Sequence, residues 1–248
     1  MTRDTEVVAG RRAALEAVRS GRASEVLVAS GSRETSALRE LLEAVAETAV
    51  RVREVPRAEL DRMAEDHRGV VTRLATQREL SERDLATWPF PEDALAVVLD
   101  GVTDPQNLGA AARSAEAVGV TMLVTRVRRA AAVTPAAVRA SAGALLHLPH
   151  ARVANISKAI GRLQEAGFFV VGLDGSAPVT VYDGACPEGR VALVLGSEGE
   201  GLSRLVREAC DALVALPMAG RVSSLNASAS LAAVLYAYVL PSRHGARA

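Results

Sequence analysis

Lysine is almost absent from this sequence of 248 residues: Lys158 is the only one, so arginine carries nearly all of the positive charge. The 29 basic residues, Lys and Arg together, are balanced by 29 acidic ones, which makes the formal net charge zero. A chain without a basic excess lacks the usual signature of a nucleic-acid-binding protein. The charge balance therefore argues against indiscriminate binding of polyanions and leaves room only for a local basic surface.

Cysteine and long apolar runs are also scarce. Cys186 and Cys210 form no CxxC pair and have no basic neighbour in the sequence, so we expect inert thiols and neither a disulfide framework nor a zinc site. No apolar run reaches the ~18 residues of a membrane span, and the N-terminus lacks the apolar centre of a signal peptide. We therefore expect a cytoplasmic protein with no metal and no membrane partner.

The sequence does contain enough apolar material for a core. Hydrophobic residues make up 49% of the chain, and 19 glycines with 10 prolines are too few for a low-complexity chain. Helical and strand patterns alternate over residues 1–77, which predicts a small α/β domain. Its clearest helix covers residues 34–49, where apolar side chains recur at the three- and four-residue spacing of one helix face.

Residues 78–93 are charged, flanked by prolines and without a sustained period, so we predict a linker. They include two basic and five acidic residues, whereas residues 94–248 include 14 basic and 11 acidic ones. The mild basic excess of the C-terminal part is therefore hidden in the sum over the whole chain. We expect Trp88 and Phe90 to pack the linker onto one domain rather than to stack on a ligand.

Short apolar runs recur in residues 94–248 between helical stretches. They are LAVVL, VTMLV, FFVVGL, VALVL and ALVAL, which begin at residues 95, 120, 168, 191 and 212. Continuous apolar strands that alternate with helices are typical of a parallel sheet covered on both faces. Gly119 and Gly167 follow two helical stretches, where helix C-caps belong. The C-terminal part is therefore predicted to be an α/β domain with a mostly parallel sheet.

Three loops at the predicted C-terminal ends of strands are rich in glycine and polar residues, and this edge of an open α/β sheet is where ligands bind. The loop DGVTDPQNLGAAAR (100–113) places Asn107 at a helix start, where its side chain can cap, and Arg113 further along. The loop LGSEGEG (195–201) has glycines that permit close backbone approach to a ligand. The loop LPMAGRVSSLNAS (216–228) has more Ser and Asn than one helix cap needs.

In this order and at these distances, the three loops resemble the motifs of the SPOUT superfamily, specifically the TrmH-type RNA 2′-O-ribose methyltransferases. The resemblance is closest to the RlmB-like 23S rRNA (guanosine-2′-O-)-methyltransferases of bacteria. It covers residues 94–240 with specific motifs and, more loosely, residues 8–75 as a small RNA-substrate-binding domain. It implies a SPOUT catalytic domain over residues 94–248 with a deep trefoil knot, an exception among folds, and a homodimer. Ala219, Arg221 and Ala227 depart modestly from the family's third motif.

The resemblance also implies a cofactor and a set of site residues. S-adenosyl-L-methionine is the implied cofactor, held mainly through backbone groups around Gly196, Leu216 and Leu225. Gly175, Met218 and Asn226 are the other implied cofactor-binding residues. The implied catalytic residues are Arg113, Asn107, Glu198, Ser224 and Asn226. The reaction is attack of a ribose 2′-hydroxyl on the sulfonium methyl group, which requires proton removal or stabilisation of the developing alkoxide. Because a guanidinium has a pKa above ~12, orienting a phosphate is an easier role for Arg113 than general base, and both stay open.

Further basic residues follow one predicted strand and allow two interpretations. Arg126, Arg128 and Arg129 form either a solvated face or, with Arg113, a set of contacts to RNA phosphates. His147 and His150 form HLPH, but the intervening proline and the missing third ligand favour surface histidines over a metal pair.

The leading hypothesis is an S-adenosylmethionine-dependent 2′-O-methyltransferase of structured RNA, with 23S ribosomal RNA and rRNA processing as the expected target and role. A tRNA 2′-O-methyltransferase and a ribosome-methylating antibiotic-resistance enzyme are alternatives in the same class. A catalytically silent RNA-binding or assembly protein is the alternative outside it. The α/β pattern alone also permits a nucleotide-binding oxidoreductase, but no GxGxxG follows an early strand.

Overall fold

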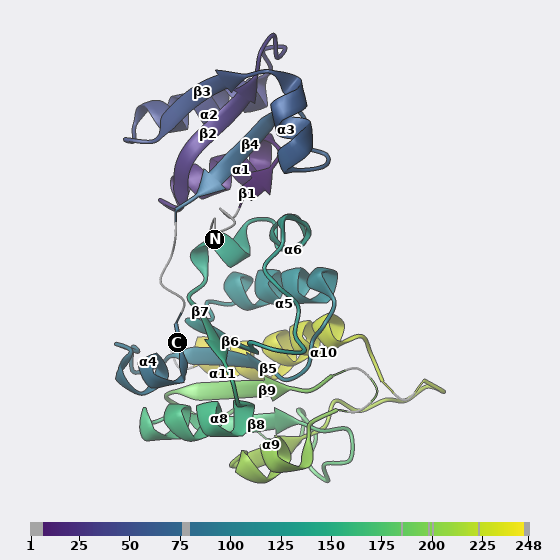
Figure 1. Cartoon of the computed structure of the whole chain (residues 1–248). Helices are drawn as coiled ribbons and strands as arrows, with labels where there is room; N and C mark the ends of the chain where they lie inside the picture. The colour runs from purple at the N-terminus through teal and green to yellow at the C-terminus, as the bar shows by residue number, and fades with distance from the viewer. Residues whose placement is uncertain are drawn as a thin grey trace. The chain divides into compact units, whose positions relative to one another are not determined.

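The structure, a computed structural model, describes residues 7–75, 80–184, 186–197, 199, 201–222 and 224–245 (Figure 1). The chain divides into two compact units. The first comprises Met1–Arg78 and Val133–His147, and the second comprises Glu79–Ala132 and Leu148–Ala248. Residues 133–147 therefore belong to the first unit, although they lie within the C-terminal part of the sequence.

The first unit is built on a mixed β-sheet. Its elements are β1 (Val7–Ala9), α1 (Arg11–Arg19), β2 (Ala23–Ala29), α2 (Ser36–Ala46), β3 (Arg51–Val55), α3 (Arg57–Met63), β4 (Val70–Leu74), α6 (Pro135–Ala140) and α7 (Ala144–His147). The strand order is β1-β4-β2-β3, in which β4 runs antiparallel to β1 and β2, and β2 runs parallel to β3. The predicted alternation of helices and strands is confirmed here.

Helix α2 shows how the apolar spacing specifies an element. Its buried residues Leu38, Leu41 and Val45 form one stripe, and α2 packs against α1. The side chain of Thr35 caps the helix by accepting a hydrogen bond from the Leu38 N–H at 3.3 Å. The helix ends three residues before its predicted end, where Thr48 Oγ1 donates to the Val45 carbonyl at 2.8 Å.

The second unit is built on a parallel sheet. Its elements are α4 (Glu82–Thr87), β5 (Leu95–Leu99), α5 (Pro105–Ala117), β6 (Met122–Arg126), β7 (His150–Val153), α8 (Ile156–Glu165), β8 (Phe169–Leu173), β9 (Val191–Leu195), α9 (Arg204–Ala209), β10 (Ala212–Val214), α10 (Ala227–Val234), the π-helical turn η1 (Leu235–Val239) and α11 (Leu240–Gly245). The strand order is β10-β8-β9-β5-β6-β7, and all neighbouring pairs in it are parallel, as predicted. Among the described residues, no helix is long and apolar enough to cross a membrane.

Helices cover both faces of this sheet (Figure 1). Helices α8 and α9 pack together on one face, and α5 and α10 pack together on the other. Strands β5 and β9, in the middle of the order, are buried along their whole length, as expected for apolar strands between two helical layers. Because the strands are parallel, their carboxyl ends meet at one edge, and the loops that follow them are brought together there.

Two elements of the second unit were not among the predicted ones. Strand β7, with the sequence HARV, extends the sheet beside β6, and only alternate residues of it are buried. Helix α4 lies in the segment 78–93, where Leu85 and Phe90 enter the core and Trp88 packs against it. The ring of Phe90 meets Phe168 edge-on, with centroids 4.7 Å apart. The expected packing of Trp88 and Phe90 onto one domain is confirmed.

Arg190 joins three backbone segments at the start of β9. Its guanidinium donates to the carbonyl of Ala166 at the end of α8, at 2.5 Å, and to those of Phe90 and Pro91 at 2.6 and 3.0 Å. The Pro91 carbonyl also accepts from the N–H of Ala94 at 3.2 Å, so the guanidinium adds a charged donor to a turn and ties it to the end of α8.

Replacing Arg190 tests this link. We expect Arg190→Ala to lower the free energy of unfolding of the second unit by about 2 kcal/mol or more, because several charge-assisted hydrogen bonds are lost together. Arg162→Ala is the matched control: it removes only an exposed ion pair with Glu165 and should change the value by less than about 0.5 kcal/mol. Urea denaturation followed by the fluorescence of Trp88 measures both, and equal stability of the two variants would contradict the assignment.

Candidate active site

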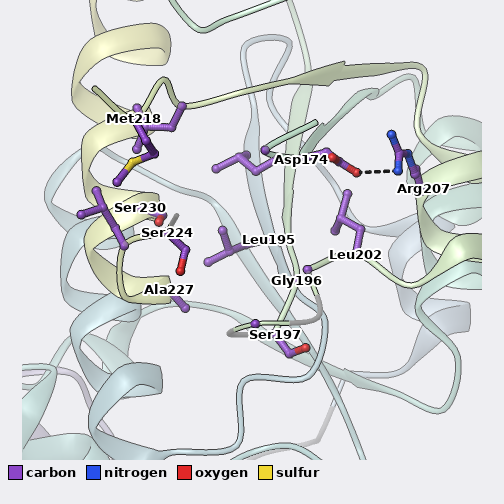
Figure 2. Close-up of a pocket in the computed structure, with 16 residues that line it drawn as sticks. Asp174, Leu195, Gly196, Ser197, Leu202, Arg207, Met218, Ser224, Ala227 and Ser230 are labelled. Atoms are coloured by element: carbon purple, nitrogen blue, oxygen red, sulfur yellow. Dashed lines mark ion pairs between the residues drawn. The ribbon is translucent and has the colours of Figure 1, made fainter. Parts of the chain in front are cut away.

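A cavity of about 440 Å³ lies at the carboxyl ends of β8, β9 and β10 (Figure 2). Five parts of the second unit line it: the end of β8 with the turn after it, described residues of the loop after β9, Arg207 of α9, the loop after β10, and the start of α10 with the two residues Ser224 and Leu225 before it. Much of the wall is apolar, with Leu195, Leu202 and Met218 among the side chains that Figure 2 shows around it. A cavity with both apolar and polar walls at this edge of a parallel sheet is typical of a ligand site.

The wall after β9 depends on a crossing of the backbone. A Cβ atom at Gly196 would overlap the carbonyl group of Gly201 and the amide nitrogen of Leu202, so only glycine fits. Two backbone hydrogen bonds between Ser197 and Gly201, of 3.2 and 3.0 Å, close the loop. The glycines of this loop were expected to allow close approach of a ligand. At Gly196, the group that approaches closely is the backbone of Gly201 and Leu202.

A polar group on the opposite wall was missed from the sequence. Asp174 follows β8 and forms an ion pair with Arg207 of α9, at 3.2 Å between Oδ2 and Nη1 (Figure 2). Ser176 donates to Asp174 Oδ1 through its N–H and its hydroxyl, at 2.8 and 2.6 Å. Burial alone would raise the pKa of Asp174, but these hydrogen bonds and the guanidinium outweigh it and lower that pKa. The cavity therefore has an ionised carboxylate in its wall. The only sequence signal was a carboxylate directly after an apolar strand.

The structure gathers most of the predicted cofactor residues around this one cavity. Those that line it are Gly175, Gly196, Leu216, Met218 and Leu225. They come from three loops separated by 21 and 20 residues of sequence, and the sheet brings them together. Ser224, predicted as a catalytic residue, lines the same cavity. Asn226 is not part of the lining.

Asn226 instead links two of the three polar loops. Its Oδ1 accepts hydrogen bonds from the N–H groups of Ser228 and Ala229, at 2.9 and 3.4 Å, and so caps α10. Its Nδ2 donates to Asn107 Oδ1 at 2.9 Å. The expectation that Asn107 caps its own helix is wrong, because Asp104 caps α5 by accepting from the backbone N–H two residues later, at 2.9 Å. Asn107 is one turn further into α5, where its side chain meets the start of α10.

Two predicted catalytic residues stand apart from these contacts. Arg113 lies on α5 with an exposed side chain and is not part of the cavity lining. No described residue forms an ion pair or hydrogen bond with its guanidinium. Glu198 lies outside the described residues. The structure thus joins Asn107 to Asn226, and among the described residues it gives the guanidinium of Arg113 no partner.

The candidate RNA-binding arginines differ from one another. Arg126, at the end of β6, places its Nε 2.6 Å from Oδ1 of Asp100, a buried carboxylate directly after β5. Ser203 Oγ lies 3.4 Å from the other oxygen of Asp100, so this carboxylate connects three loops of the site edge. Arg128 and Arg129 are exposed. Arg126 is therefore engaged within the protein, whereas its two neighbours face solvent.

The histidines have partners other than a metal. His147 lies 3.3 Å from Glu16 within the first unit, and His150 Nε2 lies 2.8 Å from Thr125 Oγ1 within the second. Among the residues that the structure describes, no group of three or more His, Cys, Asp or Glu side chains is placed to hold a metal ion. Burial raises the pKa of the Cys210 thiol to about 12, which supports the expectation of an inert thiol.

Comparison with known proteins identifies the class to which this fold and cavity belong. Residues 94–236 match the model of the SpoU rRNA Methylase family, and residues 7–80 match the model described as RNA 2′-O ribose methyltransferase substrate binding. The fold is thus that of a SPOUT methyltransferase of the TrmH type, as the sequence motifs indicated. The chain belongs to the SpoU rRNA methylase family.

Similar proteins span almost the whole chain. A tRNA/rRNA methyltransferase of Mycolicibacterium vanbaalenii, named as uncharacterized, is 42% identical over 241 residues, which cover 94% of this chain and 76% of that protein. YacO of Bacillus subtilis, named provisionally as a TrmH family tRNA/rRNA methyltransferase, is 37% identical and covers 95% of this chain and 96% of its own. The crystal structure of the SpoU methyltransferase AviRb from Streptomyces viridochromogenes, in complex with the cofactor AdoMet, has a TM-score of 0.81 at 30% identity. It covers 96% of this chain and 90% of that one, and its AdoMet confirms S-adenosylmethionine as the cofactor of this type of enzyme.

The crossing at Gly196 gives a testable consequence. We expect Gly196→Ala to lower the free energy of unfolding by about 2 kcal/mol or more, because the added methyl group would overlap backbone that cannot move without opening the loop. The control Gly161→Ala, in α8, places the same methyl group in open space and should stabilise the protein by about 0.5–1 kcal/mol. Urea denaturation compares them, and a neutral effect at Gly196 would show that the crossing is not tight.

Proposed function

We propose that the protein transfers the methyl group of S-adenosylmethionine to a ribose 2′-hydroxyl of structured RNA, and that its target is 23S ribosomal RNA. The observation that carries this proposal is the cavity, because residues singled out by two separate motifs, after β9 and after β10, line it together with the turn after β8. The match of residues 7–80 to a substrate-binding model for RNA 2′-O ribose methyltransferases supports the ribose hydroxyl as acceptor.

The residues around the cavity fit this cofactor. An adenosine moiety needs an apolar slot and hydrogen-bonding groups at its edge. Leu195, Leu216 and Leu225 supply apolar surface, and the tightly folded chain at Gly196 brings backbone groups to the cavity wall. Asp174, kept ionised by its neighbours, can accept hydrogen bonds from hydroxyl groups. These residues would hold the cofactor, and Ser224 would complete the wall beside α10.

When bound, S-adenosylmethionine supplies a methyl group on a sulfonium sulfur, and its transfer to the 2′-oxygen releases the hydroxyl proton. The task of the chain is to place the ribose hydroxyl and to stabilise the negative charge that develops on its oxygen. Arg113 is suited to this task because its guanidinium is exposed and no described side chain neutralises it. We assign Arg113 the role of orienting an RNA phosphate and stabilising charge, since a guanidinium does not lose its proton at neutral pH.

The pair formed by Asn107 and Asn226 is proposed to align the two halves of the site. Asn107 belongs to the same helix as Arg113, and Asn226 caps α10, whose first turns line the cavity. A hydrogen bond between them holds the helix of the arginine against the helix of the cofactor wall. Glu198 retains its predicted role of fixing the loops or a substrate amine.

Several finer features belong to the same proposal. We propose a homodimeric cytoplasmic enzyme with a trefoil knot formed by the segments after β9 and β10. Residues 1–77 would bind substrate, residues 78–93 would link, and residues 94–248 would catalyse. Arg126, Arg128 and Arg129 are proposed to contribute to RNA binding, with Arg128 and Arg129 making the contacts because they are exposed. Methylation of tRNA, or of a ribosomal site that confers antibiotic resistance, is the alternative within the class.

A product analysis tests the chemistry. The purified protein is incubated with unmethylated 23S rRNA transcript, total tRNA and methyl-labelled S-adenosylmethionine, and the labelled RNA is hydrolysed in alkali. We expect the label in 23S rRNA and in alkali-resistant dinucleotides, because a 2′-O-methyl group removes the nucleophile that cleaves the adjacent linkage. Label in mononucleotides would indicate base methylation, and label only in tRNA would favour the alternative target.

Arg113→Ala is the matched variant for this assay. We expect methyl transfer to fall to background while the affinity for S-adenosylmethionine, measured by calorimetry, stays within about twofold of the wild type. This outcome separates the enzyme from a catalytically silent RNA-binding protein, in which the wild type and the variant would be equally inactive. Near-wild-type transfer by the variant would show that the role assigned to Arg113 is wrong.

Asn226→Asp tests the alignment of the two helices. The carboxylate keeps the acceptor that caps α10 but replaces the donor that binds Asn107. We expect methyl transfer to fall by roughly tenfold, equivalent to the loss of about one hydrogen bond, with little change in melting temperature. Asn226→Ala, which loses the cap as well, should also lower the stability by about 1 kcal/mol. Full activity of the Asp variant would contradict the proposed alignment.

A further inference from the structure

A second cavity, of about 360 Å³, lies within the first unit and shares no lining residue with the active-site cavity. Three segments line it: the end of β1 with the start of α1, the turn before β4, and the last part of α6 with the turn that follows it. Each segment contributes arginine, and the four are Arg11, Arg12, Arg68 and Arg139. We call this cavity the arginine pocket.

The arginine pocket has more positive than negative side chains. Among the described residues, none forms a hydrogen bond or ion pair with the guanidinium of Arg12, Arg68 or Arg139, and all three side chains are exposed. Arg11 donates to Thr35 Oγ1 at 2.7 Å, a neutral partner. The pocket also contains two carboxylates, of which Glu16 is paired with His147 at 3.3 Å and the other belongs to the turn before β4. Four guanidinium groups thus face two carboxylates.

The position of Arg11 and Arg12 works against the stability of α1. They occupy its first turn, where the helix dipole favours carboxylates, and that turn contains no acidic residue. The N-cap residue of α1 also provides no side-chain hydrogen bond to the first amide groups. An anion bound in the pocket would compensate both the charges and the dipole.

The turn that carries Arg68 is held in an unusual conformation. Asp66 and Arg68 have φ values of 52° and 48°, in the left-handed region that non-glycine residues seldom adopt. His67 between them is buried, at 3% exposure. Its Nδ1 accepts from the N–H of Gly69 at 3.0 Å, and its Nε2 lies 2.8 Å from Asp61 Oδ1. The buried histidine therefore fixes a strained turn whose neighbouring side chains, Asp66 and Arg68, line the pocket.

We propose that the arginine pocket binds phosphodiester groups of the RNA substrate; this rests on the proposed function. Guanidinium groups bind phosphate oxygens in a planar, bidentate manner, and several around one cavity suit a bent or folded backbone better than a straight one. The third wall belongs to residues 133–147, which are continuous at both ends with β6 and β7 of the second unit. RNA held in the pocket would therefore contact chain segments from both halves of the sequence, beyond the residues 7–80 that match a substrate-binding model.

The salt dependence of RNA binding tests the proposal. Binding of the 248-residue protein to fluorescein-labelled 23S rRNA transcript is measured between roughly 0.05 and 0.5 M KCl. The same measurement is made for Arg12→Ala, Arg68→Ala and Arg139→Ala, singly and combined. Each lost phosphate contact should weaken binding roughly fivefold at 0.1 M salt and make the slope of log K against log salt less negative by about 0.7. Arg33→Ala, an exposed arginine of the same unit outside the pocket, is the control and should match the wild type.

A pair of variants that keeps every arginine provides a second test. Ala142 lines the pocket with φ of 51°, a conformation that Asn and Asp tolerate better than most residues. Ala142→Asp adds a negative charge to the pocket and should weaken RNA binding roughly fivefold at 0.1 M salt, the effect of one phosphate contact. Ala142→Asn has nearly the same shape without the charge and should bind like the wild type.

The outcomes distinguish this proposal from the proposed function. Weaker binding and a shallower slope in the triple variant, with wild-type binding in Arg33→Ala and Ala142→Asn, support the pocket. Wild-type affinity and slope in the triple variant and in Ala142→Asp overturn it, even if the enzyme methylates RNA normally. If the wild type binds RNA through the pocket but transfers no methyl group, the pocket stands and the proposed function fails.

Discussion

The crossing of the chain at Gly196 is the constraint on which the active site depends. The glycine follows β9 directly, and the backbone of residues 201 and 202 passes so close that no side chain can be accommodated between them. This contact fixes the loop after β9 at the sheet edge. The loops after β8 and β10 and the first turns of α10 can then form the other walls of one cavity. Without this crossing the same residues would be surface loops.

The polar groups of the site are arranged around this wall by contacts between elements distant in sequence. Burial alone would raise the pKa of Asp174, but Ser176 and Arg207 lower it and keep the carboxylate ionised. The pair of Asn107 and Asn226 joins α5 to α10, and the buried carboxylate of Asp100 pairs with Arg126. In each case the polar side chain has a partner on another helix or strand: Asp174 on α9, Asn226 on α5 and Asp100 on β6. The same contacts therefore stabilise the fold and position the site.

The charged side chains of the protein are unevenly distributed over the structure. The formal net charge is zero, yet the four arginines of the arginine pocket gather around one cavity of the first unit, and Arg113 is unpaired among the described residues of the second. Other arginines are used within the fold, as Arg126 and Arg190 are. A balanced sum is thus compatible with local basic sites, which suits recognition of a folded RNA by shape more than by general attraction.

The sequence by itself determined the central strands of the parallel sheet, since strands covered by helices on both faces must be apolar throughout. It also contained the two motifs whose residues line the cavity. It did not determine β7, an edge strand with polar residues on its exposed side, nor α4, whose helix is stabilised by packing rather than by a long apolar period. The partner of Asn107, the ionised Asp174 and the association of residues 133–147 with the first unit were decided only by the tertiary structure. The spacing of apolar residues in a segment indicates which of its sides is buried. These features depend instead on which distant segment packs beside it.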